Sequence, residues 1–293
     1  MIVDAHAHVF RPAAVSPRGV DELAPAERDA PVEGLMSVMA EHGVGAAVLV
    51  PLDEHDDYVR DALRAHPRQF AAVAVAGPAD QGRSAEDPVE RLKRRRRDFP
   101  FHALRTRWLG TPGRPIRESP FFPVLRLLAE EGLCLWTYLQ PDQRVLAGEA
   151  ARELPVLTMV LNHLGFFPDD MRVDPHGRPY FDDPFPASTR SWLRRLARHP
   201  NVRVMFSGEY AMSRLEPPYT DLDEVVHEIA GAFGASRMLW GSDYPWTREV
   251  PGYPALLDLP RATFPRASPG ELDDIRGGTA LRLFPHLRRL EDT

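Results

Sequence analysis

Two histidines lie one residue apart near the start of the chain. The segment "VDAHAHVF", residues 3–10, contains His6 and His8. Successive side chains of a β-strand point to opposite faces, so residues two apart share a face. If this segment is a strand, the two imidazoles point the same way and can hold a divalent metal ion or polarise a water molecule. Such a pair alone is weak evidence, because histidines also occur at surfaces and in cores without a chemical role.

Two more polar residues end apolar runs further along the chain. His163 follows the apolar run of "LNHLG", and Asp243 follows that of "LWGSDYPW". Each alone has a structural explanation, because aspartates cap helices and turns. Four such residues at the ends of predicted strands would require four unrelated coincidences. The joint pattern therefore indicates one site built where the strands end.

The elements that must position these residues alternate along the chain. Short apolar runs predict strands that are buried on both faces, at residues 2–9, 46–51, 71–76, 103–106, 134–139, 158–161, 203–206 and 238–241. Between and after them, helical patterns occupy residues 32–42, 56–66, 86–97, 120–131, 143–153, 186–199, 221–233 and 269–284. Asp221, with Glu224 three residues later, predicts a capping box at the start of one helix.

Eight strands alternating with helices predict an α/β fold, a parallel (β/α)8 barrel over residues 1–293 as a single domain. An open, doubly wound sheet is the alternative, but no glycine-rich phosphate loop follows the first strand. Residues 11–31 and 166–185 are long proline-containing connections that follow strands. In a barrel they lie over the carboxyl-terminal mouth, where barrel active sites are built.

Composition and charge limit the partners of the chain. Its formal net charge is −6, so no general attraction to nucleic acid is expected. Its apolar runs are too short to span a membrane, and no signal-peptide pattern is visible at the start. Cys134 is the single cysteine, which excludes an internal disulfide and fits a reducing cytoplasm. We expect a cytoplasmic protein with a small-molecule substrate; the sequence is compatible with a homo-oligomer.

The basic run "KRRRR", residues 93–97, allows two interpretations. It can be a nucleic-acid patch, or it can be the solvated end of a helix, where cations also suit the helix dipole. We favour the helix end.

Several segments together resemble the amidohydrolase superfamily. They are "DAHAHVF", "LNHLG", "FSGEYAMSRLEPPY", "WGSDYPW" and "IRGGTALRLF". More narrowly, they are similar to the amidohydrolase-related branch that contains 2-pyrone-4,6-dicarboxylate lactonase and sugar-lactone hydrolases. The resemblance covers almost the whole chain and implies a distorted (β/α)8 barrel. It further implies that Asp243 takes a proton from the attacking water, and that His163 orients this water or polarises the substrate carbonyl.

The chain departs from the metal-dependent members of this superfamily at two strands. Many of them supply a histidine from strand five, where this chain offers Tyr138, and some a lysine or acidic residue from strand four, where it offers Arg105 and Arg107. A two-metal site is therefore not expected. A single zinc or manganese ion held by His6, His8 and Asp243 and a metal-free site are equally compatible with the sequence.

Arginines and aromatic residues near the strand ends are candidates for substrate contacts. Arg105 and Arg107 can share a face and bind a carboxylate in a bidentate manner. Tyr138, Tyr210 and Arg214 are further substrate-binding candidates. Lactonases of the dicarboxylate type often read Tyr-Arg where this chain has Tyr210 and Ala211, which argues against a pyrone dicarboxylate as the substrate.

Together with these residues, the resemblance implies a hydrolase that opens a lactone of a small carboxylated, sugar-acid or pyrone-like compound. Asp243 and His163 would activate water, and His6 and His8 would stabilise the oxyanion directly or through a metal. The alternative is a metal-dependent non-oxidative decarboxylase or hydratase, because one barrel supports several reactions. A non-catalytic binding protein is disfavoured because the set of four polar residues is complete.

Overall fold

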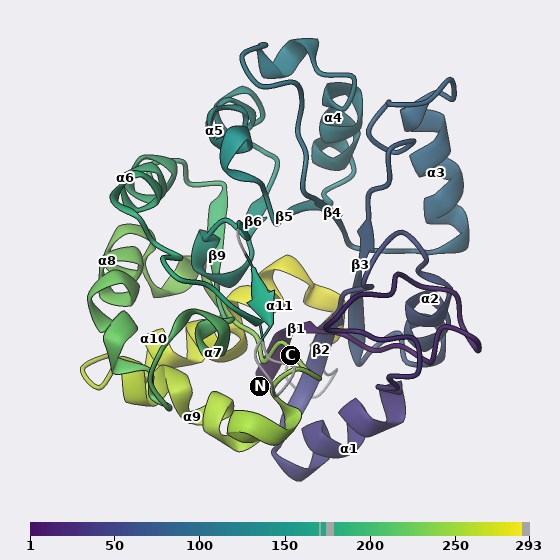
Figure 1. Ribbon diagram of the computed structural model, residues 1–293. Helices are drawn as coiled ribbons and strands as arrows, with labels where there is room; N and C mark the ends of the chain where they lie inside the picture. The colour runs from purple at the N-terminus through teal and green to yellow at the C-terminus, as the bar shows by residue number, and fades with distance from the viewer. Residues whose placement is uncertain (170, 174–178, 289–293) are drawn as a thin grey trace.

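A nearly closed barrel of parallel strands forms the centre of the molecule. The computed structural model describes residues 1–169, 171–173 and 179–288 (Figure 1). Eight parallel strands pair in the order β1 (Ile2–Ala7), β2 (Val44–Leu49), β3 (Phe70–Val75), β4 (Ala103–Thr106), β5 (Cys134–Thr137), β6 (Met159–Leu161), β9 (Val202–Phe206) and β10 (Met238–Trp240). The predicted (β/α)8 barrel is confirmed, and each predicted strand overlaps an observed one.

Helices surround the strands, as Figure 1 shows. They are α1 (Val32–Glu41), α2 (Asp57–Ala65), α3 (Pro88–Asp98), α4 (Phe122–Glu130), α5 (Arg144–Glu153), α6 (Ala187–Leu196), α7 (Glu209–Met212), α8 (Asp223–Phe233), α9 (Tyr253–Thr263), α10 (Pro269–Asp273) and α11 (Thr279–Leu283). The sequence patterns did not predict α7, α9 or the small hairpin of β7 (Arg172–Val173) and β8 (Pro179–Tyr180). None of the helices in the described part of the chain is long and apolar enough to cross a membrane.

The first and last strands meet through a seam of main-chain and side-chain bonds. Ala7 pairs with Tyr244 in a parallel bridge, and the amide of His8 donates to Tyr244 O at 2.7 Å. The amide of Asp243 donates to His6 O at 2.9 Å. The buried carboxylate of Asp4 accepts from Ser242 N at 2.8 Å and from the Tyr253 hydroxyl at 3.0 Å. The seam therefore lies at the residues that the sequence marks as chemical candidates.

The strands separate two apolar layers. Val3 and Ala5 pack inside the barrel with alternate residues of the other strands, and residues of the C-terminal segment close this layer. Ala7 packs in the outer layer, between the strands and the helices. The pairing of β1 with β2 shifts register between Asp4 and Ala7, which reverses the alternation along β1.

One predicted helical stretch is confirmed with a change of geometry, and one predicted helix start is wrong. Residues 269–283 are helical throughout, but a π-helical turn at Asp274–Gly278, in which Gly277 departs from helical geometry, separates α10 from α11. A Cβ on Gly277 would lie 2.2 Å from the carbonyl oxygen of Met1, so only glycine permits the approach to the start of β1. Asp221 does not cap α8, which begins at Asp223; its carboxylate accepts instead from the amide of Arg214 at 2.8 Å.

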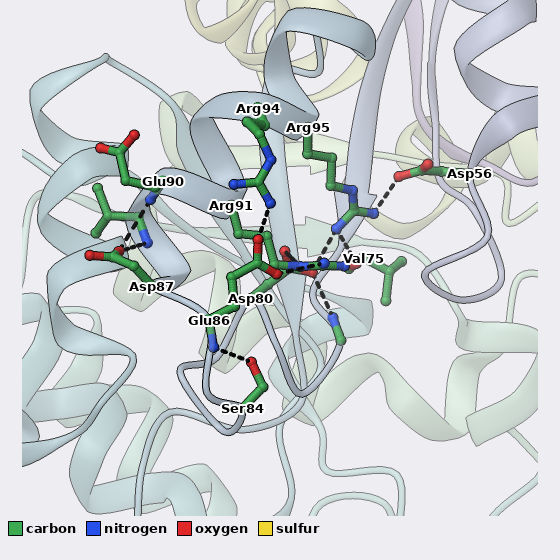
Figure 2. A network of polar contacts seen from close by, with 12 residues as sticks. Asp56, Val75, Asp80, Ser84, Glu86, Asp87, Glu90, Arg91, Arg94 and Arg95 are labelled. Carbon is green, nitrogen blue, oxygen red and sulfur yellow. Dashed lines mark hydrogen bonds and ion pairs between the residues drawn. The ribbon is translucent and has the colours of Figure 1, made fainter.

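The basic run 93–97 lies on α3, and four of its five cations form ion pairs within the described part of the chain; Figure 2 shows the surroundings of Arg94 and Arg95. Asp80 is fully buried and accepts from Arg91 Nε at 2.9 Å and Arg95 Nη1 at 2.8 Å. Arg95 also pairs with Asp56, Arg94 with Glu86, Arg96 with Glu131 and Lys93 with Glu90. These contacts favour a structural role for the run over a nucleic-acid surface.

Replacing Asp80 with asparagine is expected to lower the free energy of unfolding by about 3 kcal/mol, because the side chains of Arg91 and Arg95 lose a shared, buried counter-charge. Chemical denaturation of both proteins measures the difference. Asp98→Asn is the matched control at the end of α3, because Asp98 is 61% exposed in its pairs with Arg60 and Arg64. Equal stability changes in the two variants would contradict a structural role for the buried network.

Candidate active site

Three buried side chains converge where β1 and β10 end. The Nε2 atoms of His6 and His8 lie 3.2 Å apart. Oδ1 of Asp243 lies 3.6 Å from Nε2 of His6 and 3.3 Å from Nε2 of His8. All three residues are at least 95% buried, with exposed fractions of 0%, 5% and 5%. The predicted grouping of these residues therefore exists as a compact triangle of potential ligand atoms.

The local backbone explains how Asp243 reaches this triangle. After β10 the chain turns sharply, and Asp243 adopts a left-handed conformation with φ of 58°. Aspartate and asparagine tolerate this region better than most residues. The amide of Asp243 is bonded to His6 O in the seam, so its side chain is held beside the two histidines.

The hydrogen bonds of the histidines favour a cation between the three groups. Nδ1 of His8 lies 2.7 Å from Val50 O, which can only accept, so neutral His8 presents a lone pair at Nε2. Burial, followed by the neighbouring His8, lowers the pKa of His6 well below its ordinary value, so His6 is neutral. Oδ1 of Asp243 is also an acceptor, with no hydrogen-bond partner among the described residues.

The spacing of these atoms fits a single divalent ion. The three residues form a group whose ligand atoms all lie within 4.8 Å of one another. Nitrogen and carboxylate ligands lie about 2.0–2.2 Å from zinc, and a tetrahedral arrangement then separates ligand atoms by about 3.4 Å. The observed separations of 3.2, 3.3 and 3.6 Å agree with this value. Three protein ligands leave a coordination position open, as in catalytic metal sites.

His163 lies beside the triangle. Its Nε2 atom is 3.9 Å from Oδ2 of Asp243, and its Nδ1 atom is 2.9 Å from the Ser207 hydroxyl. Burial lowers the pKa of His163 to about 4, so the ring is neutral at pH 7. When the hydroxyl of Ser207 donates to Nδ1, Nε2 carries the hydrogen and can donate to a substrate oxygen.

Tyr210 holds the second oxygen of Asp243. Its hydroxyl donates to Oδ2 at 2.7 Å. Burial opposes ionisation of Asp243, but the surrounding histidines outweigh it and hold the pKa of this carboxyl well below its ordinary value. Asp243 is therefore ionised, and the Tyr210 hydroxyl fixes the position of Oδ2.

His8, His163, Tyr210 and Asp243 line a cavity of about 190 Å³. A cavity below the 300–1,000 Å³ of drug-sized pockets suits a molecule of about one ring. Arg105 and Arg107 reach its wall, and their guanidinium groups lie 4.9 and 5.4 Å from the centre of the Tyr138 ring. Among the described residues, neither arginine has a carboxylate partner, so both can bind oxygen atoms of a substrate.

The two long connections enclose this cavity, as the sequence predicted. Residues 11–31 contribute Asp21, Leu23 and Ala24 to the lining, and residues 166–185 contribute Phe166, Met171, Pro179 and Phe181. Residues 170 and 174–178 of the second connection lie outside the described residues.

Arg214 does not reach this cavity. It is exposed, and its guanidinium donates to the carbonyl oxygen of Asp182 at 2.9 Å. It lines a neighbouring depression of about 370 Å³ instead. The turn that Asp221 holds directs Arg214 there, so the geometry gives this residue no contact with the four catalytic candidates.

Three residues of the site region were missed in the sequence. Ser207 supports His163, Asp4 joins β1 to the segment after β10, and Asp21 reaches the cavity from the first connection. Ser207, in the motif "FSGEY", directly follows β9, and Asp4, in the motif "DAHAH", lies within β1, two residues before His6. Asp21 had no comparable signal, because it is one of many charged residues in a loop.

Comparison with known proteins places this geometry in a wider group. The amidohydrolase family matches residues 3–286. An L-fucono-1,5-lactonase from Burkholderia ambifaria is 27% identical over 259 residues, which cover 84% of this chain and 81% of the relative.

Two solved structures share the fold over nearly their whole length. An amidohydrolase from Burkholderia multivorans with bound zinc has a TM-score of 0.74 at 21% identity, covering 97% of this chain and 99% of the other. A putative 2-pyrone-4,6-dicarboxylic acid hydrolase from Pseudomonas putida has a TM-score of 0.72 at 22% identity, covering 98% of each chain.

Proposed function

The chain belongs to the amidohydrolase family, and on this basis we propose that it hydrolyses the ring ester of a small lactone. The observation that carries the proposal is the convergence of His6, His8 and Asp243, with His163 beside them, at a cavity sized for one ring. The similarity to a lactonase over most of the chain supports the same reaction. Residues 1–293 would act as one catalytic domain, because the first and last strands close the same barrel.

Asp243 would be the base of the reaction. A water molecule attacks the carbonyl carbon of the lactone, and the ionised carboxylate of Asp243 takes one of its protons. The carbonyl oxygen becomes an oxyanion, to which Nε2 of His163 donates a hydrogen bond. When the ring bond between carbon and oxygen breaks, Asp243 returns the proton to the leaving alkoxide. The product is an open-chain hydroxy acid.

His6, His8 and Asp243 would hold one divalent ion, zinc or manganese. When bound, such an ion supplies Lewis acidity toward oxygen at this position. The protein keeps the three ligand atoms together through the seam between β1 and the segment after β10. Bound zinc in the related barrel from Burkholderia multivorans supports this assignment.

The walls of the cavity would orient the substrate. Arg105 and Arg107 offer hydrogen-bond donors on one side, and Tyr138 packs beneath both guanidinium groups. A ring or carboxyl oxygen of the substrate would bind to these donors, which places the reacting carbonyl near Asp243. Tyr210 would act through Asp243, because its hydroxyl is bonded to that carboxylate.

A panel of five- and six-membered lactones tests the proposed reaction. We expect at least one small lactone to be hydrolysed with kcat/KM on the order of 10⁴ M⁻¹s⁻¹ or more, followed by acid release in weakly buffered solution with a pH indicator. An identically purified Asp243→Asn protein corrects for spontaneous hydrolysis and contaminating esterases. Failure on every lactone, together with CO2 release from an aromatic acid, would favour the decarboxylase alternative.

A further inference from the structure

The connection between β1 and α1 is held by one arginine. The donors of Arg18 all go to main-chain carbonyl groups of this connection. The Arg18 donors lie 2.8 Å from the oxygens of Arg11, Gly19, Ala24 and Pro25 and 3.1 Å from that of Arg28. The same guanidinium lies 4.8 Å from the centre of the Phe10 ring. Arg18 therefore holds together a connection that has no helix or strand of its own, alongside main-chain bonds such as that from Ala13 N to Ala26 O at 2.8 Å.

A second arginine, Arg28, links the connection to the wall of the cavity. Arg28 donates to the carbonyl oxygen of Leu23 at 2.6 Å, and its guanidinium lies 4.6 Å from the centre of the Trp246 ring. Trp246 lines the cavity, and its ring lies 5.8 Å from that of His8. Contacts therefore run from the connection through Arg28 and Trp246 to His8, which fixes the connection relative to the catalytic residues.

The fixed connection presents one carboxylate to the cavity. Oδ1 of Asp21 accepts from the amides of Leu23 at 3.0 Å and Ala24 at 2.7 Å, and all three residues line the cavity. These two bonds set the orientation of the carboxylate. Among the described residues no donor is bonded to Oδ2, so this oxygen is free to accept from a ligand.

The cavity wall carries charges of both signs. Arg105 and Arg107 supply donors only, whereas Asp21 supplies acceptors only. A substrate that satisfies both must carry acceptor oxygens and, elsewhere on its ring, hydroxyl donors. If a substrate carried two carboxylates and one bound to Arg105 and Arg107, Asp21 would repel the other.

We propose that Asp21 is a specificity-determining residue that accepts hydrogen bonds from ring hydroxyls of the substrate, and that Arg18 positions it. The preferred substrates are then polyhydroxylated lactones rather than unsubstituted or dicarboxylated ones. This inference rests on the proposed lactone hydrolysis and names its substrate class. Asp21 takes no part in the bond-breaking step, so its loss weakens binding of hydroxylated rings and leaves the chemistry of the ester unchanged.

Two lactones with the same six-membered ring test the inference. D-glucono-1,5-lactone carries hydroxyl groups, and δ-valerolactone carries none. We expect the wild type to prefer the hydroxylated ring, and Asp21→Ala to lower kcat/KM for it by about 10- to 100-fold, mainly through KM, because hydrogen bonds to charged groups have this strength. The values for δ-valerolactone should change by less than about 2-fold.

Arg18→Ala should shift the ratio of KM values in the same direction, because the carboxylate loses its fixed position. Glu22→Ala is the matched control, since Glu22 is exposed beside Asp21 and does not line the cavity. Equal losses on both lactones in Asp21→Ala, or no loss on either, would overturn the assignment. So would a wild type that does not prefer the hydroxylated ring.

Binding without turnover separates this inference from the proposed reaction. Calorimetry with D-glucono-1,5-lactam and δ-valerolactam, which resist hydrolysis, gives the affinity for each ring. If no lactone is turned over but the hydroxylated lactam binds more tightly in an Asp21-dependent manner, the specificity role stands and the proposed reaction falls. If lactones are turned over and the lactam affinities do not depend on Asp21, the proposed reaction stands and the specificity role of Asp21 falls.

Discussion

Asp243→Asn is expected to lower kcat for lactone hydrolysis by about 10²–10⁴-fold, the usual contribution of a general base. An amide cannot take the proton of the attacking water at neutral pH. The fold should survive, because asparagine tolerates the left-handed backbone at this position and keeps an acceptor for the Tyr210 hydroxyl. Steady-state kinetics and thermal unfolding of the same preparation measure both expectations.

Asp258→Asn is the matched control for this substitution. Asp258 is exposed on α9, away from the cavity, so its variant should retain the wild-type kcat. A kcat near the wild-type value in Asp243→Asn would remove Asp243 from the proposed mechanism. A large fall in melting temperature would instead assign the residue a structural role in the seam.

Metal removal is expected to abolish most of the activity. Dialysis against a chelator should lower kcat/KM at least about 10²-fold, and adding zinc or manganese should restore it. The same addition should raise the melting temperature of the metal-free protein by about 5 °C or more when the ion is at 100 times its dissociation constant. The physical reason is that the ion binds three ligand atoms which only the folded chain brings together.

His8→Asn should eliminate the metal-dependent rise in melting temperature, which needs no substrate to measure. His227→Asn serves as the matched control, because His227 is an exposed histidine on α8. A protein without metal that hydrolyses lactones at the full rate and gains no stability from zinc or manganese would contradict the metal assignment.

The placement of the catalytic candidates could be predicted because parallel strands end at one face of a barrel. The period of two along a strand also predicted that His6 and His8 share a face. It could not predict which face. Val3 and Ala5 point into the barrel, so strict alternation would send His6 and His8 outward; the register shift between Asp4 and Ala7 reverses this. Such a shift depends on the pairing with β2 and leaves no local signal.

Features that depend on distant contacts were beyond prediction from local patterns. Residues 269–284 carry a helical pattern, but Gly277 interrupts it because the chain passes against Met1. Asp221 and Glu224 match a capping box, yet the carboxylate of Asp221 binds the amide of Arg214 seven residues earlier. The position of Asp21 depends on Arg18, whose bonds span the whole first connection. In each case tertiary contacts outweighed a local preference.

The seam between β1 and the segment after β10 also determines when a newly made molecule becomes active. Asp4 and Ser242, which join it, are 238 residues apart in the sequence. During synthesis the histidine pair is made first, and the aspartate that completes the site is among the later residues to appear. Contacts of such long sequence separation form slowly, because the entropy of closing the loop must be overcome first. A partly made or prematurely ended chain therefore contains the histidine pair but lacks Asp243. Recovery of activity during refolding would report the docking of the last strand against the first.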